Sequence, residues 1–286
     1  LYLNLIFWII MKVKILFIGD IVGASGLKIV ETFLPTIKEK YKIDVIIANG
    51  ENISDGKGCT PREGKALFAL GVKAITGGNH TWDKPQSQDY LKSEPRSLRP
   101  MNYPKGTYGN GYYIIDEGKY KIGVLNLQGR SFMPMIDCPF RIGENAIKKI
   151  SQETKIIIID FHAEATAEKI AFTYFVDGTV SAVFGTYTHV QTSDERIFPK
   201  GTGFITDVGM TGPYDSVIGM KIDAAINRFI YQTPQKYISG TENNHISAVA
   251  VTIDSETGKC MEIERIFYPE FDKSHEIKEE EINDIN

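Results

Sequence analysis

The chain has 286 residues, of which 42% are apolar and 24% are charged, a composition typical of globular proteins and unlike that of disordered chains. Its formal net charge is −4, from 32 basic and 36 acidic residues, which argues against a global basic surface for long nucleic acids. A small phosphorylated ligand remains compatible with this charge, because local positive charge or a bound metal ion can hold it.

The cysteine pattern favours a cytoplasmic location. Cys59, Cys138 and Cys260 are odd in number, and no two of them are close in sequence. This spacing argues against a disulfide framework and against a thiolate zinc site, and it fits a reducing compartment.

Residues at both ends of the chain are predicted to lie outside the folded domain. Residues 1–10 are apolar but too few to span a bilayer, so we expect no membrane partner. Because Met11 directly precedes a strand-like run, we interpret these residues as an extension upstream of the natural start, with a membrane-associating segment as the alternative. Residues 272–286 are charged and poor in aromatic residues, which predicts a frayed tail.

Buried strands alternate with helices in the first ninety residues. The apolar runs 13–18, 44–48 and 72–75 predict strands that are covered on both faces. Helices are predicted between them at 27–41 and 60–70. Strand and helix in alternation are typical of a parallel sheet built from right-handed crossovers.

The second half of the chain adds antiparallel pairing. A hairpin is predicted from 112–115 and 121–127, and a closing hairpin from 247–253 and 261–268. The other predicted elements are strands at 156–159, 182–184 and 204–206 and helices at 165–175 and 222–230. No repeat or linker divides the chain, so we predict a single domain from 11 to 271, with two sheets and helices outside them.

Polar side chains follow the predicted strands where each strand ends. Asp20, Glu51 and Asn52 come after the first two strands, and Asn79 and His80 follow a Gly-Gly turn after the third. Because ligands bind at the carboxyl ends of strands in such sheets, these five residues are candidates for one site.

Three of the five histidines, His80, His162 and His189, follow short apolar strands. Imidazole, carboxylate and amide oxygen together suit iron, manganese or zinc better than calcium. Each histidine alone is better explained by a capped turn or a hydrogen-bonded buried position, so the prediction of a metal site depends on the set.

Five motifs carry a family resemblance. They are G-D-I-V-G at 19–23, G-E-N at 50–52, G-N-H-T-W-D at 78–83, D-F-H-A-E-A-T at 160–166 and D-V-G-M-T-G-P at 207–213. In this order they resemble the YmdB-type branch of the calcineurin-like metallophosphoesterases, and the resemblance extends from Met11 to Tyr268.

The resemblance implies a four-layer α/β/β/α sandwich, with two mixed sheets flanked by helices. It also implies a phosphodiesterase that hydrolyses 2',3'-cyclic nucleotides. The implied cofactor is a pair of divalent or mixed-valence metal ions, with iron preferred and manganese or zinc as options. The expected partner is a small nucleotide or phosphodiester substrate rather than long nucleic acid, and a homo-oligomer is an option.

The same resemblance implies a role for each site residue. Asp20, Asn52 and His189 would hold the first metal ion, Glu51 would bridge both ions, and Asn79 and His162 would hold the second. His80 would donate a proton to the departing ribose oxygen. Thr81 and Asp83 are expected to fix the turn or to orient His80, whereas Arg99 and Arg130 are weaker candidates for contacts with phosphate.

The chain departs from the family pattern at Tyr187. Family members have G-T-H-T-H where this chain has G-T-Y-T-H at 185–189. In an extended segment, positions 187 and 189 would face the same side. A neutral phenol is a poor ligand, although a ferric ion favours the phenolate. Tyr187 is therefore a tentative ligand, with simple packing as the alternative.

The departure at Tyr187 leaves the second metal ion in doubt and opens a second function. The alternative to the enzyme is a regulatory nucleotide- or phosphate-binding protein that has the same fold, one metal ion and little turnover. A protein phosphatase is a third and weaker option.

Overall fold

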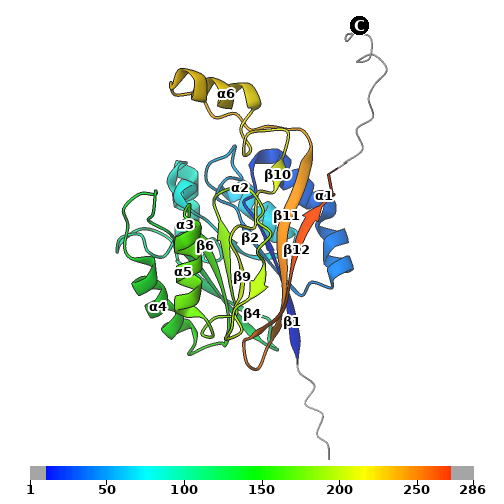
Figure 1. The fold of residues 1–286 in the computed structure, drawn as a ribbon, viewed down its shortest axis with the longest axis vertical. Coiled ribbons are helices and arrows are strands. Elements are labelled where there is room, and N and C mark those ends of the chain that lie inside the picture. Colours follow the sequence, from blue (N-terminus) through cyan, green and yellow to red (C-terminus); the bar gives the residue numbers. More distant parts are fainter. Residues whose placement is uncertain (1–10, 272–286) are drawn as a thin grey trace, which may run out of the picture.

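Two six-stranded sheets face each other in the computed structural model, which describes residues 11–271 (Figure 1). The expectations for residues 1–10 and 272–286 lie outside this range. No helix in the described part of the chain combines the length and the apolar character needed to cross a membrane.

The first sheet is mixed. Its three parallel strands, β1, β2 and β3, are the predicted ones, and β11 pairs antiparallel with β1. The strand order is β10 (Gly212–Pro213), β11 (Asn244–Asp254), β1 (Lys12–Ile18), β2 (Val45–Asn49) and β3 (Val72–Thr76), and β12 (Cys260–Tyr268) also pairs with β11.

The second sheet has a parallel centre and antiparallel edges. Strands β5, β6, β7 and β9 run parallel, whereas β4 and β8 pair antiparallel with their neighbours. The order is β4 (Tyr112–Asp116), β5 (Lys121–Gln128), β6 (Ile156–His162), β7 (Ala182–Thr186), β9 (Gly203–Ile205) and β8 (Arg196–Ile197).

Three apolar clusters separate four layers. The middle cluster lies between the sheets, where the rings of Phe17 and Phe184 approach to 5.2 Å between centroids. A second cluster covers the first sheet with α1 (Gly23–Tyr41) and α2 (Pro61–Ala69), and a third covers the second sheet with α4 (Pro139–Ile150) and α5 (Thr166–Val176). The predicted α/β/β/α sandwich is therefore confirmed.

Two helices of the structure were not predicted from the sequence. The first, α3 (Pro85–Ser93), follows a 3-10 helix, η1 (Asn79–Trp82), and its sequence is polar with little apolar periodicity. The second, α4, does carry a signal, because buried Ala146, Ile147 and Ile150 fall at helical spacing. In addition, α1 begins at Gly23, four residues before the predicted start.

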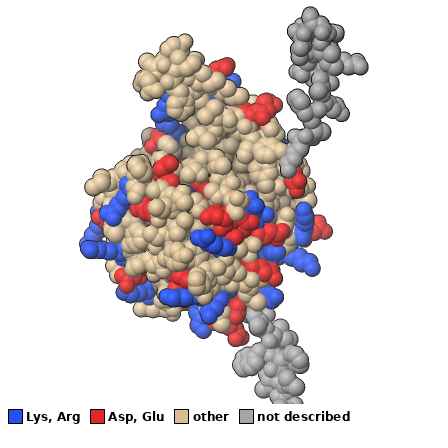
Figure 2. Space-filling model, viewed as in Figure 1, with Lys and Arg blue, Asp and Glu red and all other residues tan. Residues whose placement is uncertain are grey.

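The last helix, α6 (Ile222–Tyr231), stands apart from the sandwich at the top of Figure 1. On the face shown in Figure 2, acidic and basic residues are interspersed and form no continuous basic surface. The carboxyl ends of β1, β2, β3, β6 and β7 lead into the loops that carry the candidate site residues.

Candidate metal centre and active site

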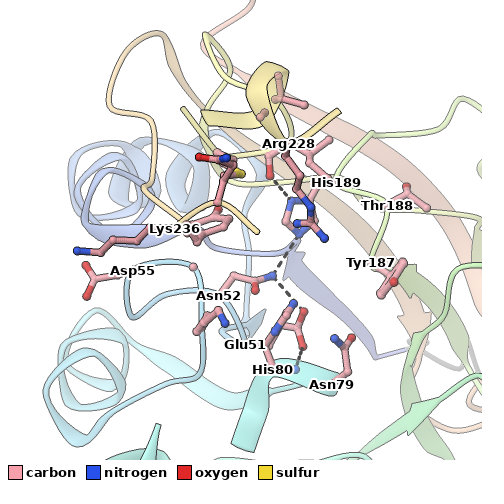
Figure 3. Close-up of a pocket in the computed structure, with 18 of the residues that line it drawn as sticks. Glu51, Asn52, Asp55, Asn79, His80, Tyr187, Thr188, His189, Arg228 and Lys236 are labelled. Carbon is pink, nitrogen blue, oxygen red and sulfur yellow. Dashed lines mark hydrogen bonds between the residues drawn. The ribbon is translucent and has the colours of Figure 1, made fainter. Parts of the chain in front are cut away.

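The structure brings all the predicted site residues together around one pocket. The pocket has a volume of about 1090 Å³ and is lined by Glu51, Asn52, Asn79, His80, Tyr187 and His189 (Figure 3). Asp20 and His162 are completely buried beside these residues. The convergence follows from the sheet order, which places the ends of strands from both sheets at one edge.

Three ligand atoms form the centre of the site. One atom each from Asp20, Glu51 and His162 lie within 4.8 Å of one another. His162 Nε2 lies 3.1 Å from Glu51 Oε1 and 3.1 Å from Asn79 Oδ1. Glu51 Oε1 and Asn79 Oδ1 are both hydrogen-bond acceptors. One positive charge between them and His162 Nε2 would therefore interact favourably with all three atoms.

Residues behind His162 fix its tautomer. Thr186 Oγ1 donates its proton to Asp160 Oδ1 at 2.7 Å, so it accepts at 2.9 Å from Nδ1 of His162. This arrangement places the ring proton on Nδ1 and leaves the Nε2 lone pair facing the pocket. A histidine held in this way is typical of metal ligands, whose second nitrogen donates to a fixed oxygen.

The pKa shifts in this cluster show how strongly it attracts a cation. Burial opposes the charged form of His162, but Glu51 and then Asp20 and Asp160 outweigh it and raise the pKa of His162 to about 9. Burial likewise opposes the charge of Glu51, yet His162 lowers the pKa of Glu51 to about 2. A proton on His162 thus takes the place that a metal ion would fill.

Asp20 supplies the test of whether a metal ion fits. Its Oδ1 atom is buried and has no hydrogen-bond partner among the residues that the structure describes. Burial, and then the nearby carboxylates of Asp207 and Glu51, raise the pKa of Asp20 well above its usual range, although His162 opposes the shift. A buried carboxylate with one free oxygen among other carboxylates is the environment that a cation stabilises, so the residues fit a metal ion.

Asn52 and His189 form the other side of the centre. Ile218 accepts a hydrogen bond at 2.8 Å from Nδ1 of His189, and Nε2 of this ring faces Asn52 Nδ2 at 3.1 Å. Burial lowers the pKa of His189, which favours the neutral imidazole that ligates metals. As a ligand Asn52 would use Oδ1, so its amide group would turn from the orientation in which Nδ2 faces Glu51 and His189.

Gly78 leaves the space that the ligands occupy. Its φ angle of −158° is accessible to any residue, but a Cβ atom there would collide with Glu51 Oε2 and with Nε2 of His162. The glycine is therefore required by space and not by backbone conformation.

We expect Gly78→Ala to lower metal affinity by about 10- to 100-fold, because the methyl group displaces Glu51 or His162. Metal titration followed by calorimetry measures the change. Gly71→Ala is the control. It strains a backbone with a φ angle of 95°, but its Cβ would meet nothing within 4 Å, so it should leave metal affinity unaltered even if it lowers stability. Equal affinity of Gly78→Ala and the unmodified protein would contradict this account of the site.

His80 lies in η1, where a turn was predicted, and is partly exposed to the pocket. Its Nδ1 atom lies 2.9 Å from Asp83 Oδ2, and Lys57 Nζ approaches the same carboxylate at 3.4 Å. Gly78 donates to Thr81 Oγ1 at 3.0 Å. These contacts agree with the expectation that Thr81 and Asp83 fix the turn or orient His80.

Tyr187 packs against the centre, but the segment from 187 to 189 is not extended, so the condition under which the two side chains would face the same side is not met. Residues 187 and 189 have φ angles of 111° and 65°, and in this turned backbone Tyr187 N donates to Asp20 Oδ2 at 3.1 Å. The Tyr187 ring meets that of His162 edge-on, with centroids 5.2 Å apart. Burial, then Glu164 and Glu51, raise the pKa of Tyr187, which keeps the phenol neutral in the absence of a metal ion.

A buried ion pair supports the loop that carries His189. Lys169 Nζ lies 2.9 Å from Asp207 Oδ2, both side chains have no exposed area, and Thr188 N donates to the same carboxylate at 3.0 Å. Asp207 belongs to one of the motifs identified in the sequence. Lys169 lies within a predicted helix and carries no sequence signal for a site.

The outer wall of the pocket also escaped the sequence prediction. It is contributed by α6 and the segment that follows, through Arg228, Phe229, Lys236 and Tyr237. The two arginines considered from the sequence, Arg99 and Arg130, do not line this pocket. Arg99 instead donates to the carbonyl groups of Pro100 and Met101 at 2.8 and 2.9 Å.

Known proteins resemble the chain over nearly all of its length. The family described as YmdB-like protein matches residues 16–266. A 2',3'-cyclic-nucleotide 2'-phosphodiesterase of Bacillus subtilis is 46% identical over 253 residues, which cover 88% of this chain and 96% of the relative.

Two solved structures agree with the family match. A hypothetical protein from Thermus thermophilus superposes with a TM-score of 0.84 at 37% identity. The match covers 89% of this chain and 98% of the Thermus protein. A novel phosphatase from Mycoplasma pneumoniae superposes with a TM-score of 0.85 at 34% identity. The match covers 90% of this chain and 94% of the phosphatase. The resemblance noted from the five motifs is thereby confirmed, and the chain belongs to the YmdB-like protein family.

Proposed function

We propose that this protein is a metal-dependent phosphodiesterase that hydrolyses small cyclic nucleotides of the 2',3'-cyclic class. The observation that carries the proposal is the buried set of Asp20, Glu51 and His162 ligand atoms at one side of a large pocket. The relatives support it, since they are named as a phosphodiesterase and a phosphatase. The chain is a hydrolase of this phosphoesterase group. Its cytoplasmic location and a homo-oligomeric state stay predictions.

The proposed ligands are the residues that converge on Glu51. Asp20, Asn52 and His189 would hold one metal ion, and Asn79 and His162 the other, with Glu51 between them. When bound, such ions supply positive charge at the phosphoryl oxygens and lower the pKa of water. Iron is the preferred metal, with manganese or zinc as options.

The protein residues account for proton transfer. Hydrolysis adds one water molecule across a bond between phosphorus and a ribose oxygen, and the departing oxygen must gain a proton. His80 Nε2 is free to donate it, because Asp83 holds Nδ1 at 2.9 Å. Asp83 keeps the ring of His80 at the pocket, beside the buried ligand set of Asp20, Glu51 and His162.

An assay with 2',3'-cyclic AMP tests the proposal. We expect hydrolysis in the presence of added iron or manganese and its loss after chelation, with activity restored when the metal is returned. Nucleotide binding without turnover under the same conditions would contradict the enzyme and favour the regulatory alternative.

Tyr187 is the observation that favours the alternative. Its phenol is neutral and packs edge-on against His162, so it would hold a metal ion less firmly than an imidazole does. We expect the purified protein to retain fewer than two ions per chain, and Tyr187→His to raise the content toward two.

Metal analysis after purification without chelator measures this change, with Tyr187→Phe as the matched control. Removing only the hydroxyl should not alter the metal content. A lower content in Tyr187→Phe would identify the phenol as a ligand, and two tightly bound ions in all three proteins would remove the case for the alternative.

A further inference from the structure

The pocket is larger than the reacting phosphate and one nucleoside require. Pockets that enclose a drug-sized ligand usually have about 300 to 1,000 Å³, and this one has about 1090 Å³. The candidate metal ligands occupy one side. The opposite side belongs to residues 217–237, a segment that we call the α6 wall.

The α6 wall is fixed to the metal centre at two points. Ile218 O accepts the hydrogen bond from His189 Nδ1 at 2.8 Å. The Tyr237 ring packs so closely over Gly56 that a Cβ atom at this glycine would collide with the ring. Gly56 belongs to the loop that follows Glu51 and Asn52, so the wall and the ligands form one built pocket.

Arg228 presents a positive charge to this pocket. Its side chain extends from α6 toward His189 (Figure 3). No carboxylate in the described part of the chain forms an ion pair with it. An arginine without an acidic partner, aimed into a pocket, is suited to bind a phosphate by paired hydrogen bonds.

Phe229 adds an aromatic surface beside this charge. It also lines the pocket, and 71% of its surface is exposed. An exposed ring next to an arginine is the combination that binds single-stranded nucleic acid, because bases stack on the ring and the arginine contacts the backbone.

We propose that the α6 wall binds the nucleotide that precedes a terminal 2',3'-cyclic phosphate, so that short RNA ends are preferred over free cyclic mononucleotides. In this arrangement Arg228 pairs with the adjacent phosphodiester and Phe229 stacks on a base. A 2',3'-cyclic phosphate requires a ribose, which makes the substrate RNA. The proposal rests on the proposed function and extends it to the substrate class.

The other charged side chains of the pocket are mixed in sign. Asp55 and Glu164 line it together with Lys57 and Lys236, and Asp55 is partly neutralised by Lys84 Nζ at 3.0 Å. This lining gives no extended basic track for a long strand, so the proposal is limited to one additional nucleotide.

The test compares kcat/KM for 2',3'-cyclic AMP with kcat/KM for adenylyl-adenosine that ends in a 2',3'-cyclic phosphate. We expect the unmodified protein to prefer the dinucleotide by about tenfold, and Arg228→Met to abolish this preference. Lys221→Met is the matched control, because Lys221 precedes α6 and does not line the pocket. It should retain the preference.

No preference in the unmodified protein would overturn the proposal. Equal losses on both substrates in Arg228→Met would also overturn it, by assigning Arg228 to the reacting phosphate. Phe229→Ala should raise KM for the dinucleotide by about tenfold, whereas Tyr231→Ala, which removes an exposed ring outside the pocket, should not. If Phe229→Ala has no effect on KM, the stacking role is wrong.

Calorimetry separates failure of this proposal from failure of the proposed function. The hydrolysis products, adenosine monophosphate and adenylyl-adenosine with a terminal monophosphate, are titrated into the protein with manganese. Tighter binding of the dinucleotide that Arg228→Met removes would support the α6 wall even in the absence of hydrolysis. Hydrolysis without any difference in affinity or rate between mononucleotide and dinucleotide would support the proposed function and contradict the proposed binding role of the α6 wall.

Discussion

His80→Ala is expected to lower kcat for a 2',3'-cyclic nucleotide by about 10²- to 10⁴-fold and to leave the metal content unaltered. The physical reason is that a ribose alkoxide is a poor leaving group without a proton, and general acid catalysis contributes effects of this size. His80 lies at the pocket with Nδ1 held by Asp83. Steady-state kinetics and metal analysis of the same preparation measure the two quantities.

A second substrate makes this prediction specific for proton donation. Bis(p-nitrophenyl) phosphate has a leaving group that departs without a proton, so His80→Ala should lose far less activity toward it. Asp83→Asn provides the matched control for orientation, with an expected loss of about tenfold on the cyclic nucleotide. Similar losses of His80→Ala on both substrates would show that His80 contributes through binding or structure instead.

Lys169→Met should lower the free energy of unfolding by about 3 to 5 kcal/mol. The substitution leaves the Asp207 carboxylate buried without its positive partner, and an uncompensated buried charge costs this much. The two side chains are 2.9 Å apart and have no exposed area. Because whole domains are stable by only about 5 to 15 kcal/mol, urea unfolding should show a large shift of the midpoint.

The double variant Lys169→Met with Asp207→Asn tests the cause of this loss. Removing the negative charge should restore part of the stability, since the neutral amide no longer lacks a counter-charge. If the loss in free energy of unfolding in the double variant equals the sum of the losses in the two single variants, the ion pair does not account for the effect. A change of solvent-exposed Lys148, which pairs with Glu144 on α4, should cost less than about 1 kcal/mol.

The sheet organisation could be predicted because it follows from local patterns of apolar residues. Apolar runs such as 13–18 and 156–159 are buried on both faces in the structure, as continuous hydrophobic strands are in parallel sheets. The missing helix α3 shows the limit. Its residues are mostly polar, so apolar periodicity does not distinguish it from a loop. The proline at its first position, a common helix start, was the one local signal.

The loop at Tyr187 could not be predicted from spacing alone. Positions 187 and 189 share a face only in an extended chain, whereas the backbone here turns and Tyr187 N donates to Asp20 Oδ2. Asp20 is far away in sequence, so no local pattern contains this contact. Lys169 is another example, because a lysine within a helix is normally exposed.

The sequence by itself determined the fold family, through the resemblance of its five motifs, and the positions of the candidate ligands at strand ends. Those positions could be predicted because alternation of strand and helix brings carboxyl ends to one edge whatever the details of packing. Only the tertiary structure decided the Nδ1 tautomer of His162, through Thr186 and Asp160, and the position of Arg228 across the pocket. Both depend on side chains from separate elements that meet after folding, and the sequence pattern of one element does not contain the identity of its neighbours.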